Sequence, residues 1–158
     1  MNKKGLIIVI IIVILLVIVI GCVPFLTRKK VVEYHNLKSF HYGCTQGMYY
    51  LDRVSYDVEY QDGQYIATIL LPNVEEENAK VVYLNDKEVE KLISIFNKYE
   101  VSTWDGFHKN DPNVLDGSSF SFSMTTRDGE SVSASGYMKY PKNYRDVVNA
   151  LDDFFESL

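Results

Sequence analysis

The sequence predicts an α+β fold: an antiparallel β-sheet with two amphipathic helices packed on one face, preceded by one N-terminal hydrophobic helix. Three observations lead to this prediction. Segments of alternating apolar and polar residues flank two Asp-Gly dipeptides, a pattern typical of β-hairpins. Two further segments repeat apolar residues at helical spacing. A long apolar run lies near residue 1.

The first expected element is this apolar run, which contains only Leu, Ile and Val over residues 6–20. Extending it to Leu26 gives 21 residues without a charge. As a helix it would be about 31 Å long, close to the thickness of the hydrocarbon core of a bilayer. Basic residues flank it on both sides. We therefore expect residues 1–30 to be a membrane anchor and residues 31–158 to form a single α+β domain.

The same residues also resemble the signal of a bacterial lipoprotein. Lys3 and Lys4 precede the apolar run, and the segment that ends in Gly21-Cys22 resembles a lipobox. This resemblance implies cleavage of a signal peptide and lipid attachment at Cys22. Against it, the residues after Cys22 stay apolar and the run is at the upper limit for a signal peptide. An uncleaved transmembrane helix and a cleaved lipoprotein signal therefore both stay open, with the uncleaved helix placed first.

Both interpretations give the same location for the domain. A short basic N-terminus usually stays in the cytoplasm. We therefore expect the protein at the cell membrane, with a single N-terminal anchor and its domain on the extracytoplasmic side.

The first hairpin is expected around Asp62-Gly63, which follows an alternating segment at residues 48–60. A two-residue loop there would place Tyr60 opposite Tyr65 and direct the apolar side chains of both strands to one face. Two shorter strands are expected at residues 37–42 and 80–84.

The second hairpin is expected around Asp128-Gly129. With a two-residue loop, the aromatic side chains of residues 119–126 and the small apolar side chains of the next strand would face opposite ways. A three-residue loop pairs Met124 with Val132 and directs both sets to one face. The sequence therefore predicts a three-residue loop with a left-handed Gly129 in a bulge.

Two helices complete the domain. Asn85 and Glu88 have the spacing of a capping box, and an apolar stripe then continues to about Tyr99. Pro141 and Asn143 are expected to start the last helix. Its apolar stripe comprises Tyr144, Val147, Val148, Leu151, Phe155 and Leu158.

Residues 100–118 show no clear periodicity and are expected to form a long loop, and loops of this length are often functional. The loop contains the chain's single tryptophan. We expect this side chain to close one end of the core, with the polar residues 109–113 exposed. The candidate interaction residues of the loop are Trp104, Phe107, His108, Lys109 and Asn113.

Several short motifs lie in the last sixty or so residues. They are Trp104-Asp105-Gly106-Phe107, residues 114–120 (VLDGSSF), Ser135-Gly136-Tyr137 and residues 140–144 (YPKNY). Together they resemble a group of small uncharacterised, membrane-anchored bacterial envelope proteins. The resemblance implies a location in the cell envelope and no known activity.

Charge limits the classes of partner. Residues 31–158 carry 11 basic and 21 acidic residues, a net charge of −10. Nucleic acid is therefore not expected as a partner, because contacts with phosphates need a basic surface. The expected partners are the membrane lipid bilayer and a protein, peptide or envelope component.

The sequence contains no recognisable catalytic, cofactor-binding or metal-binding motif. His35, His41 and Cys44 do not have the spacing of a zinc site. Cys44 with His41 would suggest a nucleophile and its base only if the two side chains face each other. We expect no cofactor and no metal. A non-catalytic binding module is favoured, and the alternative is a small envelope enzyme whose site is assembled from scattered residues.

Overall fold

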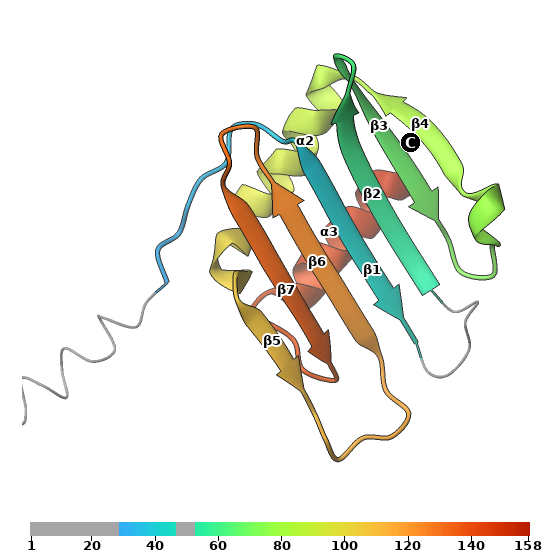
Figure 1. Ribbon diagram of the computed structural model, residues 1–158, viewed down its shortest axis with the longest axis vertical. Coiled ribbons are helices and arrows are strands. Elements are labelled where there is room, and N and C mark those ends of the chain that lie inside the picture. Colours follow the sequence, from blue (N-terminus) through green and yellow to red (C-terminus); the bar gives the residue numbers. More distant parts are fainter. Residues whose placement is uncertain (1–28, 47–52) are drawn as a thin grey trace, which may run out of the picture. The chain divides into compact units, whose positions relative to one another are not determined.

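The structure is a computed structural model that describes residues 29–46 and 53–158 (Figure 1). The expected anchor, including Cys22, and residues 47–52 of the expected second strand lie outside the described residues. Across the described ranges, no helix has both the length and the apolar character needed to cross a membrane. Val31–Leu158 form one compact unit.

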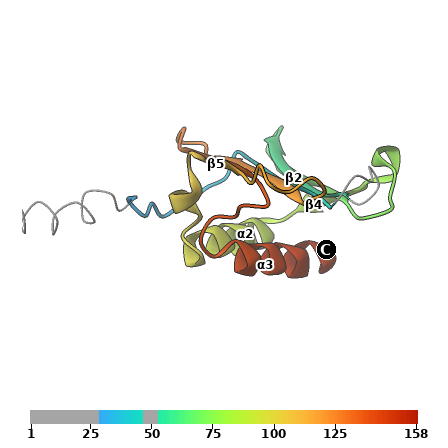
Figure 2. The same cartoon turned by 90° about the horizontal axis from the view of Figure 1, so that it is seen from below.

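The described domain is α+β, with a seven-stranded mixed sheet in the order β4-β3-β2-β1-β6-β7-β5. The strands are β1 Ser39–Thr45, β2 Arg53–Gln61, β3 Gln64–Leu70, β4 Lys80–Leu84, β5 Phe107–Asn110, β6 Ser119–Thr125 and β7 Ser131–Tyr137. The helices are α2 Asp86–Lys98 and α3 Tyr144–Glu156, with short 3-10 turns η1 Glu76–Asn78 and η2 Val101–Trp104. Both α-helices lie on the same side of the sheet, which leaves the other face open (Figure 2).

The expectation of a purely antiparallel sheet is wrong, because the edge strand β5 pairs in parallel with β7. The prediction of one long loop over residues 100–118 is wrong for the same reason, since this segment contains η2 and β5. Two hydrogen bonds hold this segment against β7. Ser133 N donates to the side-chain oxygen Asp105 Oδ1 (3.0 Å), and Gly106 N donates to the backbone oxygen of Ser133 (2.9 Å). A four-residue strand is too short to give a period that can be recognised in sequence.

Both predicted hairpin registers are confirmed. Tyr60 lies opposite Tyr65 across the first hairpin, and Met124 lies opposite Val132 across the second. Gly129 has a φ of +89°, in the left-handed region that glycine enters without steric cost. The apolar side chains of neighbouring strands therefore reach the same face of the sheet, as the patterns of alternation require.

The predicted capping box at the start of α2 is also confirmed. Glu88 N donates to Asn85 Oδ1 (3.1 Å), and Asn85 N donates to Glu88 Oε2 (2.7 Å). These bonds satisfy two backbone donors that have no partner within the helix. At the start of α3, Asn143 has a left-handed backbone, and its side chain donates to Tyr99 O (3.3 Å) instead of capping the helix.

Aromatic side chains dominate the core between the sheet and the helices. Tyr56 on β2 stacks on Phe155 on α3 with 4.3 Å between ring centroids. Trp104 is 1% exposed and meets Phe122 edge to face at 5.2 Å. Its Nε1 donates a hydrogen bond of 2.9 Å to Lys142 O, which joins η2 to the segment before α3. Because the apolar residues on one face of the sheet pack against the helices, the opposite face is free to carry polar side chains.

Candidate functional site on the open face of the sheet

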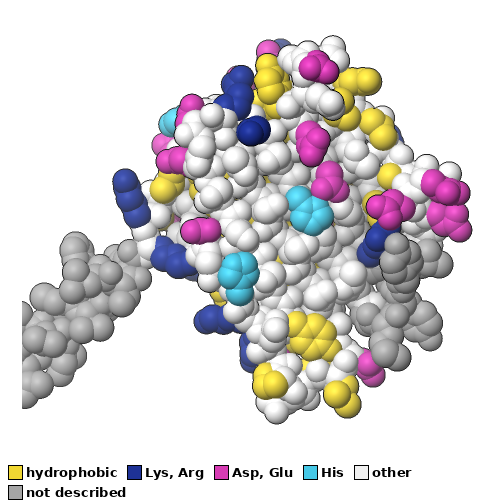
Figure 3. Space-filling model, in the orientation of Figure 1, with side chains coloured by type: hydrophobic (Ala, Val, Ile, Leu, Met, Phe, Trp, Pro, Cys, Tyr) yellow, Lys and Arg dark blue, Asp and Glu magenta, His cyan; other side chains and the backbone are white. Residues whose placement is uncertain are grey.

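Small hydroxyl side chains cover the part of the open face that β6 and β7 form. On β6 and β7 they alternate with buried apolar residues, so that every hydroxyl points away from the helices. These residues are Ser119, Ser121, Ser123, Thr125, Ser131, Ser133 and Ser135. Figure 3 shows this face, where few hydrophobic side chains reach the surface in the middle of the sheet. Short polar side chains allow a ligand to approach the sheet closely and to form hydrogen bonds with it.

A groove of about 480 Å³ lies on this face, over one end of the central strands. Its lining comes from β1, β2, β3, β6 and turn η1. The polar side chains that line it include His41, Thr45, Arg53, Asp57, Glu76 and Ser121. Its volume lies within the range of about 300–1,000 Å³ that is typical of small-molecule sites.

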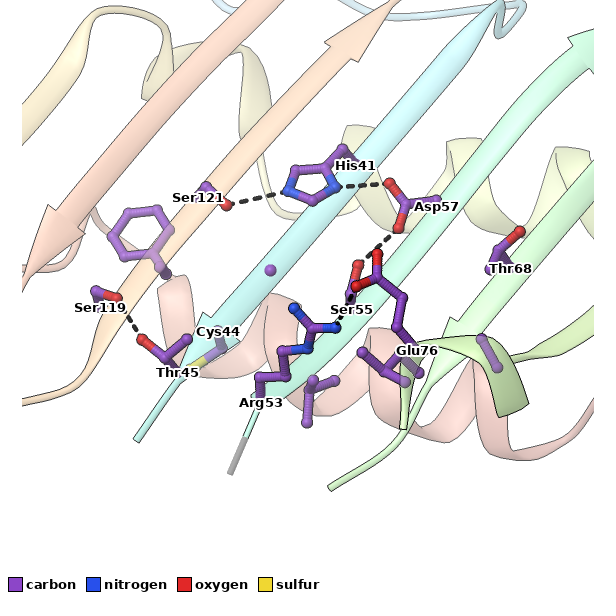
Figure 4. Close-up of a pocket in the computed structure, with 15 residues that line it drawn as sticks. His41, Cys44, Thr45, Arg53, Ser55, Asp57, Thr68, Glu76, Ser119 and Ser121 are labelled. Atoms are coloured by element: carbon purple, nitrogen blue, oxygen red, sulfur yellow. Dashed lines mark hydrogen bonds and ion pairs between the residues drawn. The ribbon is translucent and has the colours of Figure 1, made fainter. Parts of the chain in front are cut away.

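His41 on β1 connects side chains from both neighbouring strands within this groove (Figure 4). Its Nδ1 lies 2.6 Å from Asp57 Oδ1 on β2, and its Nε2 lies 3.1 Å from Ser121 Oγ on β6. Ser55 Oγ donates a second hydrogen bond of 2.6 Å to Asp57 Oδ2. The carboxylate is thereby held in place from two sides, and the imidazole is held between an acceptor and a hydroxyl.

Gly43 makes this arrangement possible. His41 is directly opposite Ser123 in the strand register, yet its ring hydrogen-bonds to Ser121, which is opposite Gly43. A Cβ at Gly43 would lie 3.0 Å from Ser121 Oγ and 3.2 Å from His41 Nε2. Only a glycine therefore leaves the imidazole unobstructed room to lean toward Ser121.

Two ion pairs balance the charges of the groove. The hydrogen bond to Asp57 raises the pKa of His41, although burial acts in the opposite direction. Burial raises the pKa of the Asp57 carboxyl, but hydrogen bonds from His41 and Ser55 outweigh it, so that the pKa is lowered overall. Arg53 pairs with Glu76 at 2.9 Å beside them. Each positive group that lines the groove therefore has a carboxylate partner.

The His41–Asp57 pair gives a testable dependence on pH. Because the pKa of His41 is raised from 6.5, its stabilising effect is fully present below pH 6.5 and is lost as the pH rises through the folded-state pKa. Because the pKa of Asp57 is lowered from 3.8, its effect is present above pH 3.8 and is lost as the pH falls through its folded-state value. The pair should therefore stabilise the domain most between pH 3.8 and 6.5.

An NMR titration of the His41 ring checks this prediction. In the wild type the midpoint should lie above 6.5, and Asp57→Asn should lower it. Ser123→Ala, on the same face of β6, should leave the midpoint unchanged. Equal midpoints in the wild type and Asp57→Asn would show that the carboxylate does not hold the imidazolium in solution.

The candidate interaction residues of the segment 100–118 do not form one site. Trp104 is in the core, which fits the structural role expected for it, and Phe107 is half-buried. His108, Lys109 and Asn113 are exposed, with His108 Nδ1 lying 2.9 Å from Ser135 Oγ at the edge of the sheet. Trp104 is therefore part of the core, whereas His108, Lys109 and Asn113 lie on the surface.

The other groupings considered from the sequence do not form either. Cys44 is one of the partly buried residues packed against the core, on the opposite side of β1 from His41. Burial also raises the pKa of the Cys44 thiol, the reverse of what activates a cysteine. Within residues 29–46 and 53–158, no three His, Cys, Asp or Glu side chains are placed to hold a metal ion.

No protein-family model matches this chain, and no curated protein matches it. The function must therefore be inferred from the chemistry of the open face.

Proposed function

We propose that this protein is a membrane-anchored, extracytoplasmic binding module that holds a neutral glycan of the cell envelope in the groove on the open face of its sheet. The groove itself carries this proposal, because it combines closely spaced hydroxyls with two charge-balanced pairs, His41–Asp57 and Arg53–Glu76. The anchor and its orientation come from the apolar run at residues 6–20 and its basic flanks.

The lining of the groove favours a ligand rich in hydroxyl and amide groups. Serine and threonine hydroxyls both donate and accept hydrogen bonds, carboxylates accept them, and guanidinium groups donate them. A sugar presents both kinds of group along its length. Hydrogen bonds to charged groups contribute about 1.5–3 kcal/mol each, so Asp57 and Arg53 would provide the strongest contacts.

The charge of the domain argues for a neutral ligand. Each cation of the groove is paired with a carboxylate, so a bound anion would have to compete with Asp57 or Glu76. The net charge of −10 over residues 31–158 would also repel a polyanion such as a nucleic acid.

Binding of N-acetylglucosamine tetramer to the full-length protein in detergent, measured by calorimetry, tests the proposal. Asp57→Ala and Arg53→Ala should each weaken binding about tenfold or more, because each removes a charged hydrogen-bonding group. Ser133→Ala is the matched control, since Ser133 is on the same face but is not among the residues that line the groove. Unchanged affinity in both groove variants, or binding of anionic polymers in preference to the tetramer, would contradict the proposal.

A further inference from the structure

We propose that Ser121, His41 and Asp57 form a nucleophilic relay through which Ser121 accepts an acyl group from an activated ester. This activity goes beyond glycan binding and does not depend on it. The geometry of three side chains on adjacent strands carries the inference.

The order of the contacts is the one that activates a serine. Ser121 Oγ lies 3.1 Å from His41 Nε2, and His41 Nδ1 lies 2.6 Å from Asp57 Oδ1. An ionised carboxylate only accepts hydrogen bonds, so the Nδ1 proton is directed to Asp57. In the neutral imidazole this leaves the lone pair of Nε2 facing the serine hydroxyl, as a general base requires.

The three residues are open to a substrate. Ser121 is exposed and lines the groove, and the side chains of His41 and Asp57 are 41% and 42% exposed. Ser55 holds the second carboxylate oxygen, which fixes Asp57 in the position where it orients the imidazole. The hydroxyl thus lies beside a space large enough for a small ligand while its base is held from behind.

The backbone around Ser121 restricts the substrate to activated acyl groups. Strand β6 is paired on both sides, with β1 and with β7, so its amides are used within the sheet. In the described part of the groove, no pair of strand N–H groups is therefore available as an oxyanion hole. Loss of one such donor typically costs a factor of 10²–10³ in rate. Aryl esters and thioesters, which have good leaving groups, remain accessible, whereas amides do not.

The reaction needs only Ser121, His41, the ester and water. Ser121 Oγ forms a bond to the acyl carbon and passes its proton to His41 Nε2. The bond from the acyl carbon to the leaving oxygen or sulfur breaks, and the leaving group takes the proton from His41. Water then attacks the acyl-serine with His41 again as base, which releases the carboxylic acid and restores Ser121.

Labelling of the full-length protein in detergent with a fluorophosphonate tests the inference. The Oγ–P bond forms as the P–F bond breaks, and fluoride leaves while the serine proton passes to His41. Mass spectrometry should locate the adduct on Ser121 and not on Ser123 or Ser135. The Ser123→Ala variant should be labelled at the wild-type rate, since Ser123 is on the same face of the same strand.

Three variants separate the roles. His41→Ala should lower the labelling rate by about 10²-fold or more, the contribution typical of a general base. Gly43→Ala should lower it as well, because the new methyl group would crowd both Ser121 Oγ and His41 Nε2 and push them out of position. Asp57→Asn tests Asp57 as a positioning residue: the rate should fall, and its dependence on pH should shift together with the His41 titration. The titratable group that faces His41 from β2 is Asp57, whereas β6 presents Ser121 and Ser123.

Labelling that is absent, that is spread over several exposed serines, or that persists unchanged in His41→Ala would overturn the inference. Thermal melts of each variant show whether a loss of labelling reflects unfolding. Gly43→Ala and His41→Ala disturb the Ser121–His41 contact in two independent ways. Because glycan binding is measured separately by calorimetry, failure of one proposal can be distinguished from failure of the other.

Discussion

Trp104→Ala is expected to lower the free energy of unfolding by about 3–5 kcal/mol, the cost typical of removing a large aromatic side chain from a core. Trp104 is 1% exposed and contacts Phe120, Phe122 and Tyr144 through its ring. The substitution would leave a cavity between η2 and the sheet. It would also remove the hydrogen bond that Nε1 donates to Lys142 O.

Urea unfolding of residues 31–158 measures this effect, since the buried core residues of the described chain all lie within that segment. Tyr83→Ala is the control, because Tyr83 is 67% exposed on the edge strand β4 and its loss should change stability little. A Trp104→Ala domain as stable as the wild type would argue that Trp104 is a binding anchor and not part of the core.

Gly136→Ala is expected to destabilise the domain by about 3 kcal/mol or more, at the upper end of the usual cost of overpacking. A Cβ at this position on β7 would overlap the backbone oxygen of Lys139 and lie 2.7 Å from Phe120 Cε1. Neither the turn after β7 nor a buried ring can move aside easily. The glycine is therefore required by the close approach of the chain that follows β7.

Gly117→Ala provides the matched control for this prediction. A Cβ at Gly117 would also be crowded, but mainly by the Met138 side chain, whose Sδ would lie 2.9 Å away, and less closely by Tyr137 Cζ at 3.0 Å. Because a methionine side chain can change rotamer, this variant should lose much less stability. Equal losses in the two variants, measured by urea unfolding, would show that the backbone contact at Gly136 is not the cause.

Local signals in the sequence predicted most of the fold. Alternation together with the left-handed Gly129 determined the second hairpin register, and the Asn85–Glu88 capping box marked the start of α2. Strand β5 could not be found in this way. It has only four residues. Its parallel partner is β7 and not β6, the strand that follows it in the chain, so no local pattern indicates the pairing.

The candidate site was less accessible to sequence reasoning. The sequence suggests Cys44 as a partner of His41, because it lies three residues away, but the structure places Cys44 on the other side of the strand. The actual partners of His41 are Asp57 and Ser121, which are 16 and 80 residues away. Only the order β6-β1-β2 brings them together, and strand order is a property of the whole fold. The alternating serines of β6 do predict that one face of this strand is exposed, but they do not indicate that Ser121 contacts His41.

The most direct test of the proposed binding face is an NMR titration of isotope-labelled residues 31–158 with N-acetylglucosamine tetramer. If the groove on the open face holds the glycan, the largest shifts should occur at residues of β1, β2 and β6 that line it, including His41, Asp57 and Ser121. Amides of α2 and α3, on the opposite side of the sheet, should change little. Shifts confined to the helices or to the edge strand β4, or no shifts at millimolar tetramer, would contradict the proposed function.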